Sequence, residues 1–154
     1  MGIKEKEYII EVFSEGRDPE GERAASELSH VSGYEAEEIS FSRIYSLRGQ
    51  LEDEEKVLER ISSELLCDSV TQDYSIGLRA VDAPSVRVYL KNGVLDVEGK
   101  TLMEALEIMG IEGVSRAAAA RRYIMKGGRG DNLAGAAGEF LYNSVIEYAE
   151  IEEG

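Results

Sequence analysis

Apolar and polar positions along residues 85–110 change from a strand pattern to a helix pattern. Val86, Val88 and Leu90 alternate with polar or aromatic residues, which is the period of a half-buried strand. Asn92-Gly93 follows, and both residues tolerate the positive φ of a turn. Apolar residues then recur at the spacing of one helix face, at Leu102, Met103, Leu106 and Met109. The pattern predicts a strand, a turn and a helix.

A similar order of elements is predicted near the start of the chain. Residues 8–14 alternate as a strand, and Gly16 suits a turn. Asp18 can cap the next helix, where Pro19 fits the first helical position because its missing N–H is not needed there. The predicted buried stripe of this helix consists of Ala24, Ala25, Leu28 and Val31.

Two pairs of short motifs indicate that the chain contains an internal repeat. Asp-Pro-Glu-Gly at 18–21 matches Asp-Val-Glu-Gly at 96–99, which lies 78 positions later. Asp-Ser-Val-Thr-Gln at 68–72 matches Asn-Ser-Val-Ile-Glu at 143–147, which lies 75 positions later. Similar offsets in the same order predict duplication of a unit of about 75 residues. We place the first repeat at 1–84 and the second at 85–154.

The remaining elements of each half follow from the same periodicities. Residues 35–51 predict either one long bent strand or two strands joined near Arg43. Residues 114–125 have the local propensity of a helix, but the repeat requires a strand, and we predict the strand. Strands are also predicted at 70–78 and 145–151. A helix precedes each of them, and each half is β-α-β(β)-α-β, close to a ferredoxin-like α+β unit.

The repeated motifs resemble those of the PurS family, the small subunit of phosphoribosylformylglycinamidine synthase. Lys-Asn-Gly-Val-Leu-Asp-Val-Glu-Gly, residues 91–99, resembles the family signature Gly-Val-Leu-Asp-Pro-Gln-Gly. Residues 64–74 and 143–148 resemble its closing Leu-Leu-Ala-Asn-(Pro/Thr)-Val-Ile-Glu-Asp-Tyr. The resemblance covers nearly the whole chain, once in each half. We therefore expect two tandem copies of the family fold, packed as a pseudo-dimer.

The chain departs from the family pattern at several positions. Val97 replaces the usual proline, and one residue, Arg17, separates Gly16 from the capping aspartate where the second half has two. The family's Val-Arg-x-Gly-Lys strand is degraded at residues 39–43. In the second half, Arg121 alone stands in the position of that lysine.

The resemblance implies an accessory role in purine biosynthesis. Family members serve in a complex in which a glutaminase subunit releases ammonia. A large synthetase subunit then uses ATP and magnesium to amidate formylglycinamide ribonucleotide, while the small subunit bridges the two. This chain would have no cofactor of its own. The alternative is a tandem ligand-sensing module similar to the ACT domain, which a thermal shift with amino acids but not with partner subunits would favour.

Composition narrows the classes of partner. The net charge is −14, and residues 1–84 contribute −11 of it, from 20 acids and 9 bases. This acidity opposes binding to the phosphates of nucleic acids. No apolar run is long enough to cross a membrane, and no secretion leader is evident. Cys67 is the one cysteine, so no internal disulfide forms. We expect a cytoplasmic protein.

No catalytic or metal-binding pattern stands out in the sequence. We find no Ser-His-Asp or Cys-His set, no metal-ligand spacing around His30 and no nucleotide-binding loop. The glycine-rich residues 127–131 lack the Gly-Lys-Ser/Thr of a phosphate loop, so a flexible turn is favoured there. The predicted partner-binding residues are five basic residues without an intervening acid between 113 and 130. They are Arg116, Arg121, Arg122, Lys126 and Arg129.

Overall fold

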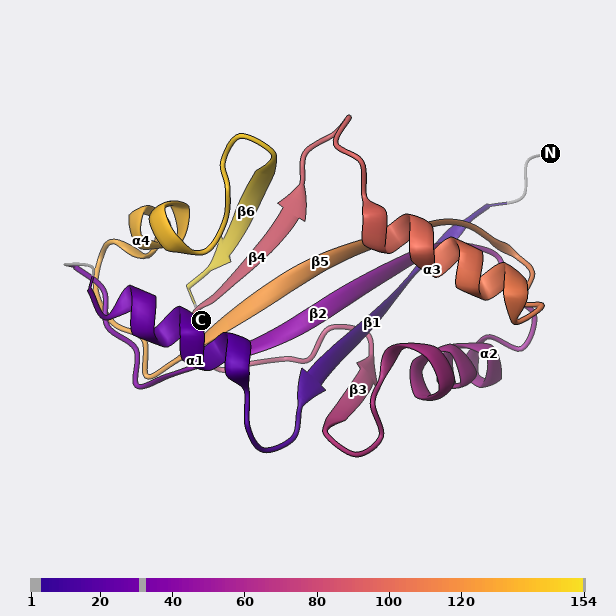
Figure 1. The fold of residues 1–154 in the computed structure, drawn as a ribbon, viewed down its shortest axis with the longest axis horizontal. Coiled ribbons are helices and arrows are strands. Elements are labelled where there is room, and N and C mark those ends of the chain that lie inside the picture. Colours follow the sequence, from indigo (N-terminus) through magenta and orange to yellow (C-terminus); the bar gives the residue numbers. More distant parts are fainter. Residues whose placement is uncertain (1–3, 31–32, 154) are drawn as a thin grey trace. The chain divides into compact units, whose positions relative to one another are not determined.

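The computed structural model describes residues 4–30 and 33–153 (Figure 1). Its first part contains, in chain order, β1 (Lys6–Ser14), α1 (Pro19–Leu28), β2 (Glu38–Gly49), α2 (Glu54–Ile61), the π-helix η1 (Ser62–Leu66) and β3 (Gln72–Ile76). Its second part contains β4 (Ser85–Leu90), α3 (Val97–Ile108), β5 (Val114–Lys126), α4 (Leu133–Phe140) and β6 (Glu147–Glu152). Both halves therefore have the order β-α-β-α-β.

The strands form one sheet in the order β3-β1-β2-β5-β4-β6. β3 runs antiparallel to β1, and β4 runs antiparallel to both β5 and β6. Over the described residues, six antiparallel strands and four α-helices make an α+β fold. The predicted tandem of ferredoxin-like units is confirmed.

The chain folds into two compact units, and each takes segments from both halves of the sequence. Unit 1 consists of the residues up to Glu15 together with Arg43–Arg79 and Leu95–Ala119. Unit 2 consists of Gly16–Ser42, Ala80–Val94 and the residues from Ala120 onward. Residues 16–42 and 95–119 hold equivalent elements, a first helix and the start of the long strand after it. The first helix of each half thus belongs to the unit that is otherwise built mainly from the other half. The repeat boundary between residues 84 and 85 stays a prediction.

Each unit has its own apolar core. In unit 1, side chains of β1 and β2 pack against α2 and α3, with Ile10, Leu47, Ile61 and Leu106 among the fully buried ones. In unit 2, side chains of β4 and β5 pack against α1 and α4, and its fully buried members include Ala24, Val86, Tyr123, Met125 and Leu133. Exclusion of this apolar surface from water is the main favourable term in the folding of both units.

The repeated Asp-x-x-Gly motif fastens each first helix to its long strand. Asp18 accepts a hydrogen bond from the N–H of Gly21 at 2.9 Å, which caps α1, and a second from the N–H of Phe41 in β2 at 2.7 Å. Asp96 accepts from Gly99 at 2.8 Å and from Ala119 in β5 at 2.9 Å. The same two hydrogen bonds recur 78 positions later in the sequence, which supports the internal duplication.

The structure resolves the two open predictions about the long strands. β2 is a single strand of 12 residues. β5 is a strand of 13 residues, so the strand expected from the repeat is confirmed and the helical propensity of its alanines is overridden. Ala117 packs against the core of unit 1, and the N–H of Ala119 bonds to Asp96, a contact made by extended backbone.

Some sequence predictions were wrong in detail. β3 covers only five residues of the strand predicted at 70–78, and the apolar residues Val70, Ile76 and Leu78 are exposed, at 84%, 51% and 38%. β3 is an edge strand, and edge strands are short and incompletely covered. His30 is exposed at the end of α1, as predicted for a surface histidine. Val31, expected on the stripe of α1, lies outside the described residues.

Candidate functional site

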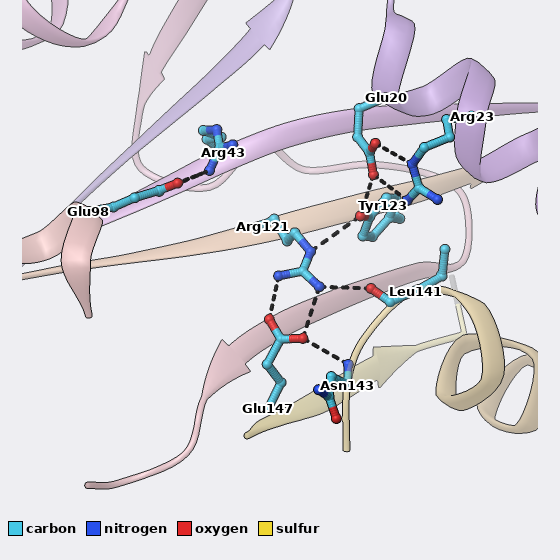
Figure 2. A network of polar contacts seen from close by, with 9 residues as sticks. All are labelled: Glu20, Arg23, Arg43, Glu98, Arg121, Tyr123, Leu141, Asn143 and Glu147. Atoms are coloured by element: carbon cyan, nitrogen blue, oxygen red, sulfur yellow. Dashed lines mark hydrogen bonds and ion pairs between the residues drawn. The ribbon is translucent and has the colours of Figure 1, made fainter. Parts of the chain in front are cut away.

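A network of buried and part-buried polar groups in unit 2 is centred on Arg121 of β5 (Figure 2). Its guanidinium donates two hydrogen bonds to the carboxylate of Glu147, at 2.5 and 3.1 Å. It also donates to the carbonyl of Leu141 at 2.8 Å and to the hydroxyl of Tyr123 at 3.2 Å. The side chain of Arg121 is 27% exposed and that of Glu147 is 11% exposed. This bidentate geometry is the strongest form of ion pair available to arginine.

The turn before β6 places Glu147 for this contact. The N–H of Asn143 donates to the carboxylate of Glu147 at 2.8 Å, and the N–H of Glu147 donates to the carbonyl of Asn143 at 2.8 Å. The side-chain oxygen of Asn143 in turn accepts from the N–H of Val145 at 3.0 Å. The motif Asn-Ser-Val-Ile-Glu is therefore a self-bonded turn that presents one carboxylate to the sheet.

The network continues from Tyr123 to α1. The hydroxyl of Tyr123 donates to Glu20 at 2.7 Å, and Arg23 holds the carboxylate of Glu20 at 2.6 and 2.7 Å. Tyr123 is 1% exposed, and its ring stacks on Phe41 with 5.4 Å between centroids. The chain of contacts joins α1, β5, the residue after α4 and β6.

The charge states follow from these contacts. Burial alone would raise the pKa of Glu147, but the hydrogen bonds from Arg121 and from the N–H of Asn143 lower it below the ordinary glutamate value. The hydrogen bond from Arg23 lowers the pKa of Glu20. Burial, with the hydrogen bond to Glu20, raises the pKa of Tyr123. Both carboxylates are ionised and the tyrosine keeps its proton, so every member of the network is in the state that its partners require.

Unit 1 contains a partial counterpart of this network. Arg43, 78 positions before Arg121, lies two residues before Tyr45 and pairs with Glu98 of α3 at 2.6 Å, with both side chains about half exposed. The turn is also repeated, since the N–H of Asp68 donates to the side chain of Gln72 at 2.9 Å. The residue equivalent to Glu147 is thus the neutral Gln72, and the bidentate ion pair belongs to unit 2.

The predicted partner-binding residues have different environments. Arg116 is exposed in unit 1, whereas the other four belong to unit 2. Arg121 and Arg122 are buried or largely buried, and Lys126 and Arg129 lie 3.8 and 3.5 Å from Glu38 and Glu35. The five residues therefore differ in burial and in the acids beside them, and their contact with a partner stays a prediction.

The network is suited to holding elements together. Among the described residues no group of three or more His, Cys, Asp or Glu side chains is placed to hold a metal ion. The thiol of Cys67 is part-buried against the core of unit 1, and burial raises its pKa, which disfavours the thiolate. The ion pair itself fixes β6 and the end of α4 to β5.

Sequence reasoning missed the contacts of this network and a separate buried ion pair in unit 1. Glu20 and Tyr123 lie on elements that were predicted, but their pairing joins the two halves of the sequence, which no local pattern reports. Glu11 of β1 is fully buried, and its carboxylate pairs with Arg79 at 3.1 Å. The position of Glu11 among the apolar residues of β1 is the one sequence signal that could have indicated a buried ion pair.

Comparison with known proteins assigns the family. No helix in the described part of the chain has the length and apolar character needed to span a membrane. Comparison with curated proteins found no match. The model of the PurS family, described as phosphoribosylformylglycinamidine (FGAM) synthase, matches twice, over residues 9–80 and 84–153. The two matches confirm the tandem repeat. The chain belongs to the PurS family and has a role in FGAM synthase and purine biosynthesis.

Proposed function

We propose that this chain is the non-catalytic small subunit of an FGAM synthase complex, which bridges a glutaminase subunit and an ATP-dependent synthetase subunit and supports transfer of ammonia between them. The observation that carries the proposal is that the two family matches, 9–80 and 84–153, together account for nearly the whole chain. The buried charged groups of the Arg121 network are engaged with one another, which supports a scaffolding role.

The chemistry of the reaction then belongs to the partners. Glutamine would be hydrolysed by the glutaminase subunit, and ATP and magnesium would be bound by the large subunit. This chain would need no cofactor and would act in the cytoplasm with both enzymes. Its contribution would be to hold the two active sites in one complex, which raises the effective concentration of ammonia at the second site.

Reconstitution with the purified glutaminase and large synthetase subunits tests the proposal. FGAM formation is measured with glutamine and, separately, with ammonium as the nitrogen source, with and without this chain. We expect omission to abolish most glutamine-dependent turnover and to leave most of the turnover with saturating ammonium. Glutamine-dependent turnover that is unchanged without the chain would refute the bridging role.

A further inference from the structure

A groove of about 820 Å³ opens on unit 1 beside α2 and the edge strand β3. Its apolar lining includes Leu58 of α2, Ile76 of β3 and Leu78 just beyond that strand. Its acidic lining includes Glu7, Glu55 and Glu59. The groove therefore combines apolar side chains with a row of carboxylates.

The apolar part of the groove is unusually open to solvent. Ile76, in the edge strand, is 51% exposed, and Leu78, two residues after it, is 38% exposed. Apolar residues on an exposed edge favour unwanted association, and proteins usually cover or charge such edges. An exposed apolar surface rimmed by polar groups is typical of an interaction site.

Two carboxylates of the groove, Glu55 and Glu59, have no counterion among the described residues, whereas Glu7 lies 3.8 Å from Arg48. Glu55 and Glu59 are one turn apart on α2, a spacing at which like charges repel. Both are exposed, and neither side chain has a hydrogen bond or ion pair within the described residues. Glu54, in contrast, is held by Lys6 at 2.7 Å. A cation supplied from outside would relieve the repulsion between Glu55 and Glu59.

Unit 2 presents a different surface on the corresponding helix. α4 contains one acidic residue, Glu139, and buries Leu133, Ala136 and Ala137. A homodimer must present every surface twice, but two fused repeats are free to differ. α4 therefore has no pair of carboxylates equivalent to Glu55 and Glu59 of α2.

We propose that this groove binds a segment of a partner protein in which apolar side chains are flanked by lysine or arginine. The apolar side chains would cover Ile76 and Leu78, and the basic groups would pair with Glu55 and Glu59. Charge complementarity determines this choice of occupant, because an acidic or neutral segment would leave the repulsion in place. The inference rests on the proposed function, in that the partner is one of the two other subunits of the complex.

Paired variants test the electrostatic half of the inference. The groove variant is Glu55→Gln/Glu59→Gln, and the matched control is Glu104→Gln/Glu107→Gln, which removes two exposed charges from α3 of the same unit. Affinities for the purified large synthetase and glutaminase subunits are measured at low and high salt. We expect the groove variant to bind one subunit about tenfold more weakly at low salt, with a smaller loss at high salt. The control should bind as the wild type does, and neither pair should lower the melting temperature.

A second pair tests the apolar half. Ile76→Ser removes an apolar contact from the groove, and Ile108→Ser removes one from α3, where the side chain is 87% exposed. We expect Ile76→Ser to speed dissociation from the same subunit at all salt concentrations and Ile108→Ser to leave it unchanged.

The outcomes separate the inference from the proposed function. Equal effects of the groove and control variants, or no effect of either, would overturn the groove as the binding site while the bridging role stood on wild-type binding. Failure of the wild-type chain to bind either subunit would refute the proposed function and this inference with it.

Discussion

Replacing Gly99 by alanine is expected to lower the free energy of unfolding by about 3 kcal/mol. A Cβ atom at this position would lie 2.5 Å from the carbonyl oxygen of Ala117 and 2.9 Å from the carboxylate of Asp96. The first is a backbone atom of β5, so the clash can be relieved only by moving α3 away from the strand. That movement would also stretch the bond between Asp96 and the N–H of Ala119.

Urea denaturation measures this effect, and Gly138→Ala is the matched control. Gly138 also lies in a helix, α4, but the nearest atom to a Cβ there is the hydroxyl of Tyr142 at 3.7 Å, an ordinary contact. Alanine is the better helix former by about 1 kcal/mol, so Gly138→Ala should stabilise the chain. Stabilisation by both substitutions would show that α3 does not approach β5 this closely.

Replacing Arg121 by methionine is expected to cost about 3 kcal/mol of stability. The substitution keeps much of the apolar stem but leaves the carboxylate of Glu147 with only the N–H of Asn143 as a hydrogen-bond partner. It also removes the donor to the carbonyl of Leu141. The carboxylate of Glu147 is 11% exposed, so without Arg121 its desolvation is no longer offset by an ion pair.

The equivalent substitution in the other unit is the control. Arg43→Met breaks the pair with Glu98, whose side chains are 47% and 49% exposed, and it should cost no more than about 1 kcal/mol. Thermal and urea unfolding of both variants give the comparison. Arg121→Met/Glu147→Met should recover part of the loss, because no buried charge is then left unpaired. Equal losses of unfolding free energy for Arg121→Met and Arg43→Met would show that the buried ion pair stabilises the chain no more than the exposed one.

The features predicted correctly from the sequence are those with a local cause. Asp18 was identified as a helix cap because its side chain can accept from the free N–H groups of the first turn, and it caps α1 in the structure. β5 was predicted against its helical propensity because the repeat fixed its place between two helices. Period-2 and period-3.6 patterns located the other strands and helices.

The features that were missed depend on contacts between distant segments. No pattern in the sequence could show that Glu147, on a strand of alternating polarity, meets Arg121. Alternation also does not tell an edge strand from a covered one, so it could not show that Ile76 of β3 is exposed. β2 and β5 are long enough to contribute residues to both units. Residues 16–42 and 95–119, which lie before the dividing point of each strand, therefore belong to a different unit from the rest of their half.

Separating the two repeats tests the central claim that they complete each other. Unit 1 needs Leu102 and Leu106 of α3 for its core, and residues 1–84 do not contain them. We expect residues 1–84, produced alone, to show no cooperative unfolding as a monomer by circular dichroism and sedimentation, and to regain it when residues 85–154 are added. A monomeric 1–84 fragment that unfolds cooperatively, with the stability of the intact chain, would contradict the account.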